Sequence, residues 1–189
     1  MVRTRVGYAG GEKESPTYHS LGNHSETIEV DYDPDRISYQ ELLDVFWASH
    51  SPTMPAWSRQ YASIIFYHDQ EQMRLAEESK ERQQANQGRT MYTSIAPHTR
   101  FYRAEDYHQK YRLRFQRELM AEFDAMYPNY DDFVDSTAAA RLNGLVAGYG
   151  TAELLAAELD SYGLSPEGKA RLLEVTASLP SGAYCPTPN

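Results

Sequence analysis

The stretch Glu26–Tyr32, with the letters ETIEVDY, decides the fold class, because a turn and a helix start follow it at once. Its apolar residues Ile28, Val30 and Tyr32 alternate with polar ones, which predicts a half-buried β-strand. The sequence Asp33–Asp35 (DPD) stops the strand in a turn. Ser38–Glu41 (SYQE) then has the pattern of a capping box, which starts a helix. That helix carries an apolar face at helical spacing, formed by Leu42, Leu43, Phe46 and Trp47.

Strand and helix patterns continue to alternate on both sides of this stretch. Further strands are predicted at Arg3–Tyr8, Ala62–Tyr67 and Met91–Ile95. Asp69 is expected to cap a very polar helix that runs to Gln87. A long helix is predicted over Ala104–Met126, with one side formed by Tyr107, Tyr111, Phe115, Leu119 and Phe123. The interleaving predicts a two-layer α+β sandwich with a mixed sheet.

The end of the chain differs in composition and reads as a helical extension. Helices are predicted over Thr137–Ala147, from Thr151 to Gly163, and from Ser165 to Ser178, where Ser165-Pro166 is a strong start signal. Residues 180–189 form a tail. The expected division is therefore a first domain over residues 1–127 and a C-terminal helical extension over residues 128–189.

Composition excludes several classes of function. The 189 residues carry a formal net charge of -9, which argues against non-specific binding to nucleic acid and to anionic membranes. No apolar run approaches the length of a membrane-spanning helix, and the start has no apolar secretory core. A single cysteine cannot form an intrachain disulfide, so we expect a reducing, cytoplasmic setting. No metal site is expected.

A polar loop places a phenol, an imidazole and a carboxyl group at or just before the start of the predicted strand Glu26–Tyr32. They belong to Tyr18, His24 and Glu26. A partly desolvated carboxyl group at the start of a strand could donate a proton in catalysis. The alternative is that Glu26 is an exposed carboxylate at a strand edge and His24 a plain loop residue.

A second candidate group precedes the predicted strand Ala62–Tyr67. It is the sequence Trp57–Tyr61 (WSRQY), in which Tyr61 offers another phenol. Trp57 has two interpretations, a contact for substrate or a plug that fills the core beneath a loop.

Three motifs resemble those of the A-type peptide-methionine sulfoxide reductase family, which reduces the S epimer of methionine sulfoxide. They are Pro16-Thr17-Tyr18 with His24 and Glu26, Gln60-Tyr61 with Ser63-Ile64, and Phe101–Tyr111 (FYRAEDYHQKY). The resemblance implies a ferredoxin-like core in which Glu26 protonates the sulfoxide oxygen while Tyr18 and Tyr61 hold it. It also implies substrate-binding roles for His24 and Trp57, and a scaffold role for Tyr107 and Tyr111.

The sequence departs from the family pattern in two places. The family opens on a Gly-Cys-Phe-Trp-Gly motif that supplies the attacking thiol and the methyl pocket, and the motif is not among these 189 residues. The first strand and first helix of the family core are accordingly expected to be missing. Either the gene model is truncated or the protein is a genuine short product. The family also has an aspartate ahead of Tyr61, whereas no acidic residue lies between Ser51 and Tyr61.

The only cysteine, Cys185, lies near the end of the chain. In the family a cysteine on the C-terminal tail resolves the oxidised catalytic thiol, so Cys185 is either a resolving thiol or a bystander. The resemblance implies repair of oxidised methionine in peptides and proteins under oxidative stress, no bound cofactor, and an external reductant such as thioredoxin. Without the motif cysteine this chain is expected to be inactive alone. The rival interpretation is a non-catalytic relative that binds methionine-containing peptides or acts as a scaffold.

Overall fold

The computed structural model describes residues 2–179, which form two compact units. The first, called here the sheet unit, holds residues 6–105, and the second, the helical unit, holds residues 2–5 and 106–179. The division falls after Glu105, whereas composition placed it after residue 127. Strand β1 (Arg3–Ala9) begins in the helical unit and continues into the sheet unit.

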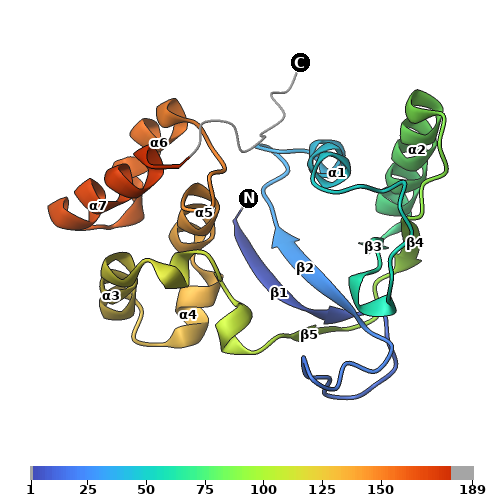
Figure 1. Ribbon diagram of the computed structural model, residues 1–189, viewed down its shortest axis with the longest axis horizontal. Coiled ribbons are helices and arrows are strands. Elements are labelled where there is room, and N and C mark those ends of the chain that lie inside the picture. Colours follow the sequence, from blue (N-terminus) through green and yellow to red (C-terminus); the bar gives the residue numbers. More distant parts are fainter. Residues whose placement is uncertain (1, 180–189) are drawn as a thin grey trace. The chain divides into compact units, whose positions relative to one another are not determined.

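The strands of the sheet unit form two small sheets (Figure 1). The first has the order β2 (Ser25–Asp31), β1, β5 (Phe101–Arg103), and β1 pairs antiparallel to β5 with Tyr8 opposite Tyr102. In the second, β3 (Ile64–Tyr67) lies parallel to β4 (Ser94–Pro97), and the α-helix α2 (Gln70–Gln87) connects them. The expected α+β class, with both antiparallel and parallel pairing, is confirmed.

The two helices of the sheet unit begin where local chemistry predicted. Helix α1 (Tyr39–Ala48) has the full capping box, in which Ser38 N–H donates to Glu41 at 2.7 Å and Glu41 N–H donates back to Ser38 Oγ at 3.2 Å. Asp69 caps α2, which ends at Gly88 in the left-handed conformation. Leu43, Trp47, Ile65 and Ala76 form the core between these helices and β3.

Burial along β2 differs from the expected alternation. Ile28 is 61% exposed, although the pattern placed it on the buried face. The reason is that β2 lies at the edge of its sheet, and that α1 and α2 pack onto β3 instead. The strand therefore presents Ile28 on the same side as Glu26, because side chains two positions apart share a face.

The long helix expected over residues 104–126 is not formed, and this prediction was wrong. The segment holds two 3₁₀ turns, Asp106–His108 and Leu113–Phe115, and only then the helix α3 (Arg117–Met126). Lys110 between the turns has φ 48°, a left-handed conformation that no α-helix accommodates. As a result Tyr107, Tyr111 and Phe115 are 48%, 52% and 65% exposed and do not form a packed helix face.

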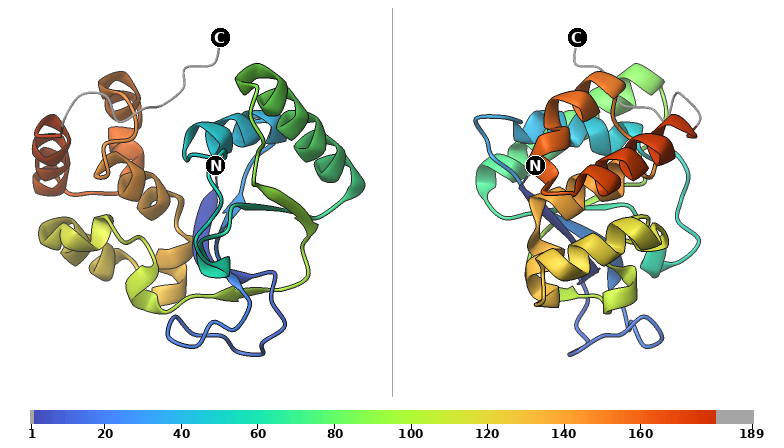
Figure 2. Two further views of the ribbon diagram at one scale, coloured as in Figure 1. Left: turned by 45° about the vertical axis from the view of Figure 1, so that its right-hand side comes forward. Right: turned by 90° about the vertical axis from the view of Figure 1, so that its left-hand side faces the viewer.

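Helices gather in the helical unit, as both views of Figure 2 show. They are α3, α4 (Tyr130–Asp135), α5 (Thr137–Leu145), α6 (Ala152–Glu158) and α7 (Pro166–Ala177). Leu119 and Phe123 are fully buried in a core that α3 shares with α4, α5 and α7. Helices α5, α6 and α7 were predicted from the sequence, whereas α4 and the three-residue strand β5 were not.

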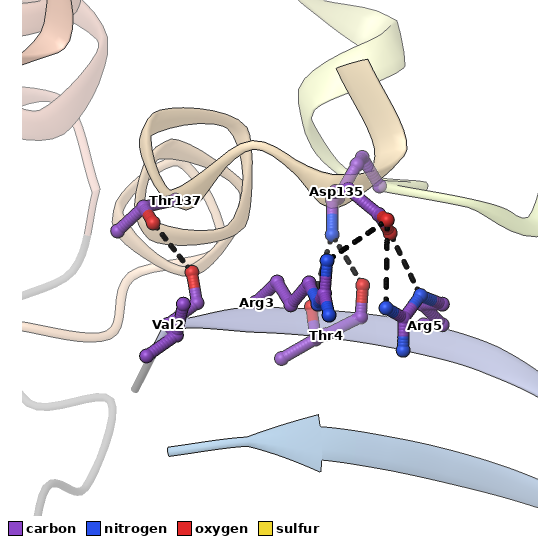
Figure 3. A network of polar contacts seen from close by, with 7 residues as sticks. Val2, Arg3, Thr4, Arg5, Asp135 and Thr137 are labelled. Atoms are coloured by element: carbon purple, nitrogen blue, oxygen red, sulfur yellow. Dashed lines mark hydrogen bonds and ion pairs between the residues drawn. The ribbon is translucent and has the colours of Figure 1, made fainter. Parts of the chain in front are cut away.

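The start of β1 is fixed within the helical unit by polar contacts (Figure 3). Asp135 accepts from Arg5 Nε at 2.7 Å and from Arg3 Nη1 at 3.1 Å. These contacts, with the Arg5 hydrogen bond first, lower the pKa of Asp135. Thr137 Oγ1 donates to the Val2 carbonyl oxygen at 2.6 Å. Nearby, the buried Lys110 ammonium donates to the Thr4 carbonyl oxygen at 2.6 Å.

Lys110 predicts a specific pH dependence of stability. Burial, reinforced by Arg5 and opposed by Asp135, lowers its pKa from 10.5 to about 8. The folded protein therefore loses this proton before the unfolded chain does, so the penalty for the buried charge is present below pH 8 and disappears above pH 10.5. Relative to Lys110→Met, the free energy of unfolding of the wild type should rise by roughly 3 kcal/mol over that range. Urea unfolding of both proteins across the range measures the difference, and parallel curves would contradict it.

Candidate active site

A short 3₁₀ turn, η1 (Arg59–Tyr61), is hydrogen-bonded to the start of β2 in the sheet unit. Ser25 is 1% exposed, and its hydroxyl donates to the Arg59 carbonyl oxygen at 2.6 Å, 34 positions along the chain. This contact places the residues after Ser25 and Arg59 next to one another. Glu26 and Gln60 are those residues.

Gln60 connects the candidate acid to a candidate phenol. Its Nε2 donates to Glu26 Oε1 at 2.7 Å and lies 3.3 Å from the hydroxyl oxygen of Tyr61. Glu26 is exposed, not partly desolvated as expected, because β2 is an edge strand. The carboxylate is therefore oriented by the Gln60 amide and remains open to a molecule that approaches from solvent.

Tyr18 completes the group. A hydrogen bond with Tyr18 is the main cause that raises the pKa of Tyr61, followed by burial and by the charges of Tyr18 and Glu26. Tyr61 is 43% exposed and Tyr18 is half-buried. The structure thus brings Tyr18, Glu26 and Tyr61 together, and the Tyr61 phenol, like that of any tyrosine, has a proton to donate near neutral pH. Their catalytic roles stay predictions.

Arg59 holds η1 against the loop that carries Tyr18. Its guanidinium donates to the carbonyl oxygens of Asn23 at 3.3 Å and Gly10 at 3.2 Å. Gly10 has φ +77°, and a Cβ there would lie 2.5 Å from Phe66, so the close approach requires glycine. The clamp has no signal in the sequence, because only the folded loop brings these groups near one another.

His24 faces the interior of the loop. It is 1% exposed, its Nδ1 accepts from Gly11 N–H at 3.1 Å, and its Nε2 lies 2.9 Å from the Lys13 carbonyl oxygen. The ring also packs edge-on against Tyr102. With both ring nitrogens used inside the protein, His24 shapes the loop that carries Tyr18.

Trp57 lies at the surface beside Tyr61. The indole is 83% exposed and stacks on the Tyr61 ring, with centroids 4.8 Å apart and planes at 30°. The interpretation of Trp57 as a core plug was therefore wrong. A flat aromatic surface of this kind, open to solvent and adjacent to the phenols, can receive an apolar group of a ligand.

Within residues 2–179, no three His, Cys, Asp or Glu side chains gather as a metal site, and no helix is long and apolar enough to cross a membrane. Cys185, the candidate resolving thiol, lies outside the described residues.

Comparison with known proteins places the chain in a family. The family model "Peptide methionine sulfoxide reductase" matches residues 1–139. A peptide methionine sulfoxide reductase of Drosophila melanogaster is 42% identical over 98% of this chain and 75% of its own length. Peptide methionine sulfoxide reductase A5 of rice is also 42% identical, over 78% of this chain and 59% of its own length.

A solved structure agrees with these sequence matches. The reduced form of Mxr1 from Saccharomyces cerevisiae matches with a TM-score of 0.56 and 33% identity, over 60% of this chain and 71% of that chain. The Drosophila match also extends through the helical unit, so α3 to α7 align with residues of that relative. The chain belongs to the peptide methionine sulfoxide reductase family.

Proposed function

We propose that Glu26, Tyr18 and Tyr61 form the oxygen-activating side of a methionine-S-sulfoxide reductase that acts on peptides and proteins. The observation that carries the proposal is the contact of Gln60 with both Glu26, at 2.7 Å, and Tyr61, at 3.3 Å, beside the phenol of Tyr18. One proton donor and two phenols around an open surface match what removal of a sulfoxide oxygen requires.

The chemistry assigns a separate role to each group. A thiolate attacks the sulfoxide sulfur while Glu26 donates a proton to the oxygen, and Tyr18 and Tyr61 donate hydrogen bonds to that oxygen as its charge grows. The sulfide is released and the attacking thiol is left as a sulfenic acid. A second thiol converts the sulfenic acid to a disulfide with release of water.

The thiols are the part of the proposal that lies outside the described residues. The attacking thiol is that of the family's Gly-Cys-Phe-Trp-Gly motif, and Cys185 takes the resolving role. An external thiol reductant such as thioredoxin then reduces the disulfide, in a reducing cytoplasmic setting, and no bound cofactor is required. The biological role would be repair of oxidised proteins under oxidative stress.

Trp57 supplies the apolar contact in this proposal. Its exposed ring, stacked on Tyr61, offers a surface for the methyl and methylene groups of the substrate within reach of the phenols. His24 acts indirectly, by holding the loop that carries Tyr18.

Ligand binding tests the proposal without any turnover. A short peptide with a ¹³C-methyl-labelled methionine sulfoxide should bind the chain more tightly than the same peptide with unoxidised methionine, as measured by NMR line broadening. Trp57→Ala should weaken binding of the sulfoxide peptide about 3- to 10-fold, the effect of one lost aromatic contact. Tyr92→Ala is the matched control, because Tyr92 is another exposed aromatic residue of the sheet unit.

Equal affinity for methionine and its sulfoxide would contradict the activation of the sulfoxide oxygen. That result would favour the alternative function, a non-catalytic module that binds methionine-containing peptides. Unchanged binding in Trp57→Ala would remove Trp57 from the site.

A further inference from the structure

Glu105, which follows strand β5 in the sheet unit, joins two distant segments through one carboxylate. Its Oε2 accepts from the Tyr8 hydroxyl at 2.6 Å, and its Oε1 accepts from the Tyr18 backbone N–H at 3.0 Å. The two donors lie 97 and 87 positions away in the chain. Hydrogen bonds to an ionised carboxylate are stronger than those between neutral groups.

One side of this contact is buried and belongs to the paired sheet. Tyr8 is 2% exposed in β1 and pairs in register with Tyr102 of β5. Tyr8, Leu21 and Ala104 form the buried core beneath the loop. The Tyr8 hydroxyl therefore holds the Glu105 carboxylate at a defined place beside the sheet.

The other side is a segment with little structure of its own. Between β1 and β2 the chain has only one isolated bridge, Thr17 to Ser20, and no helix or strand. Ser15 in this loop has φ 48°, which a serine rarely adopts. The hydrogen bonds of His24 hold the loop from within, and the contact of Glu105 with the Tyr18 backbone attaches this part of the loop to the sheet.

We propose that Glu105 is a positioning residue, which fixes the Tyr18 backbone so that the Tyr18 phenol meets Tyr61. This inference deepens the proposed function and rests on it for its catalytic meaning. Glu105 contacts the main chain of Tyr18, so it acts on the phenol through the placement of the residue. Tyr8 holds the Glu105 carboxylate, Glu105 holds the Tyr18 backbone, and the Tyr18 phenol contacts Tyr61.

The Tyr18–Tyr61 hydrogen bond gives a readout that does not depend on catalysis. It raises the pKa of Tyr61, so Tyr18→Phe should bring that pKa down towards its ordinary value. Burial and the charge of Glu26 also raise the pKa, and both remain in the variant, so the return should be partial. ¹³Cζ-labelled tyrosine followed by NMR from pH 8 to 12 measures it, with Tyr61→Phe identifying the resonance.

Three further variants test the proposal. Glu105→Ala should lower the Tyr61 pKa as Tyr18→Phe does, and should weaken binding of the sulfoxide peptide about 2- to 10-fold, the effect of one hydrogen bond. Glu105→Gln should change the Tyr61 pKa less than Glu105→Ala does, because its amide oxygen can still accept from Tyr18 N–H, although the neutral amide group replaces the carboxylate that accepts from Tyr8. Tyr8→Phe, which leaves the Tyr18 contact intact, should give a change smaller than that of Glu105→Ala.

The outcomes separate positioning from general stability. A Glu105→Ala protein with a lower melting temperature but an unchanged Tyr61 pKa would overturn the proposal. If Glu105→Ala does not fold, Glu105→Asp, whose carboxylate is one methylene shorter, should give the same shift, and its absence would overturn the proposal equally. If Glu105→Ala and Tyr18→Phe share the pKa shift but neither changes sulfoxide affinity, the positioning role is supported and the proposed function fails.

Discussion

Replacing Glu26 by Gln should lower the rate of sulfoxide reduction by about one to four powers of ten, the range of a positioned general acid. The amide keeps the shape of the side chain, and its oxygen can still accept the hydrogen bond from Gln60 Nε2. It cannot release a proton to the sulfoxide oxygen. Turnover should therefore fall while binding of the sulfoxide peptide stays nearly constant, and the loss should shrink at lower pH, where solvent acid substitutes in part.

The assay needs an attacking thiol, which can be supplied by joining a relative's Gly-Cys-Phe-Trp-Gly segment ahead of Met1. The 189 residues alone, with Cys185 as their single thiol, should show no reduction with dithiothreitol, and changing the cysteine of the joined segment to serine should abolish turnover. Turnover by the 189 residues that disappears in Cys185→Ser would instead make Cys185 the nucleophile.

Two comparisons isolate the role of Glu26. Glu29→Gln changes a carboxylate on the same strand, three positions on and on the other face, and should have no effect on rate. Tyr18→Phe and Tyr61→Phe should each cost less than Glu26→Gln, because each phenol can support the oxygen when the other is absent. Full activity of Glu26→Gln at neutral pH would show that Glu26 is only an exposed carboxylate at a strand edge and not the acid.

Helices whose ends are determined by local capping residues could be predicted from the sequence. The capping box at Ser38 and the cap at Asp69 gave the starts of α1 and α2 correctly, because the determining hydrogen bonds span three residues. Strand β5 was missed because three residues carry no periodic pattern, and only pairing with β1 makes them a strand. The exposure of Ile28 likewise depends on where helices pack, which alternation along β2 does not encode.

The candidate site divides along the same line. Tyr18, Glu26 and Tyr61 could be named because their motifs resemble those of a known family, whereas the residue types alone left open that Glu26 is an exposed strand-edge carboxylate. The contacts of Gln60 with Glu26, of Arg59 with Gly10, and of Glu105 with Tyr18 each connect residues far apart in the chain. Such contacts cannot be predicted from the spacing of residues along the chain, and each of these side chains could form hydrogen bonds with many other residues.

Phe123→Ala should destabilise the protein by about 3–5 kcal/mol, the cost of a large cavity in a core. Phe123 is fully buried in the helical unit, with the rings of Phe133 and Tyr127 at 5.8 Å and 6.0 Å. Phe115→Ala is the matched control. Phe115 is 65% exposed, so the same truncation should change the free energy of unfolding by only about 0.5 kcal/mol.

The pair also decides between two descriptions of the chain from residue 104 to 126. A continuous helix would place Phe115 and Phe123 on one buried face, and both truncations would then be costly. The left-handed Lys110, whose ammonium reaches the Thr4 carbonyl oxygen 106 positions away, interrupts the segment before Phe115. Gln116, with φ −96° and ψ 83°, interrupts it again and separates Phe115 from the helix α3 that carries Phe123. Only Phe123 then lies in the core. Equal losses in urea unfolding of the two variants would contradict this arrangement, and a loss confined to Phe123→Ala would show that a tertiary contact overrides helical periodicity here.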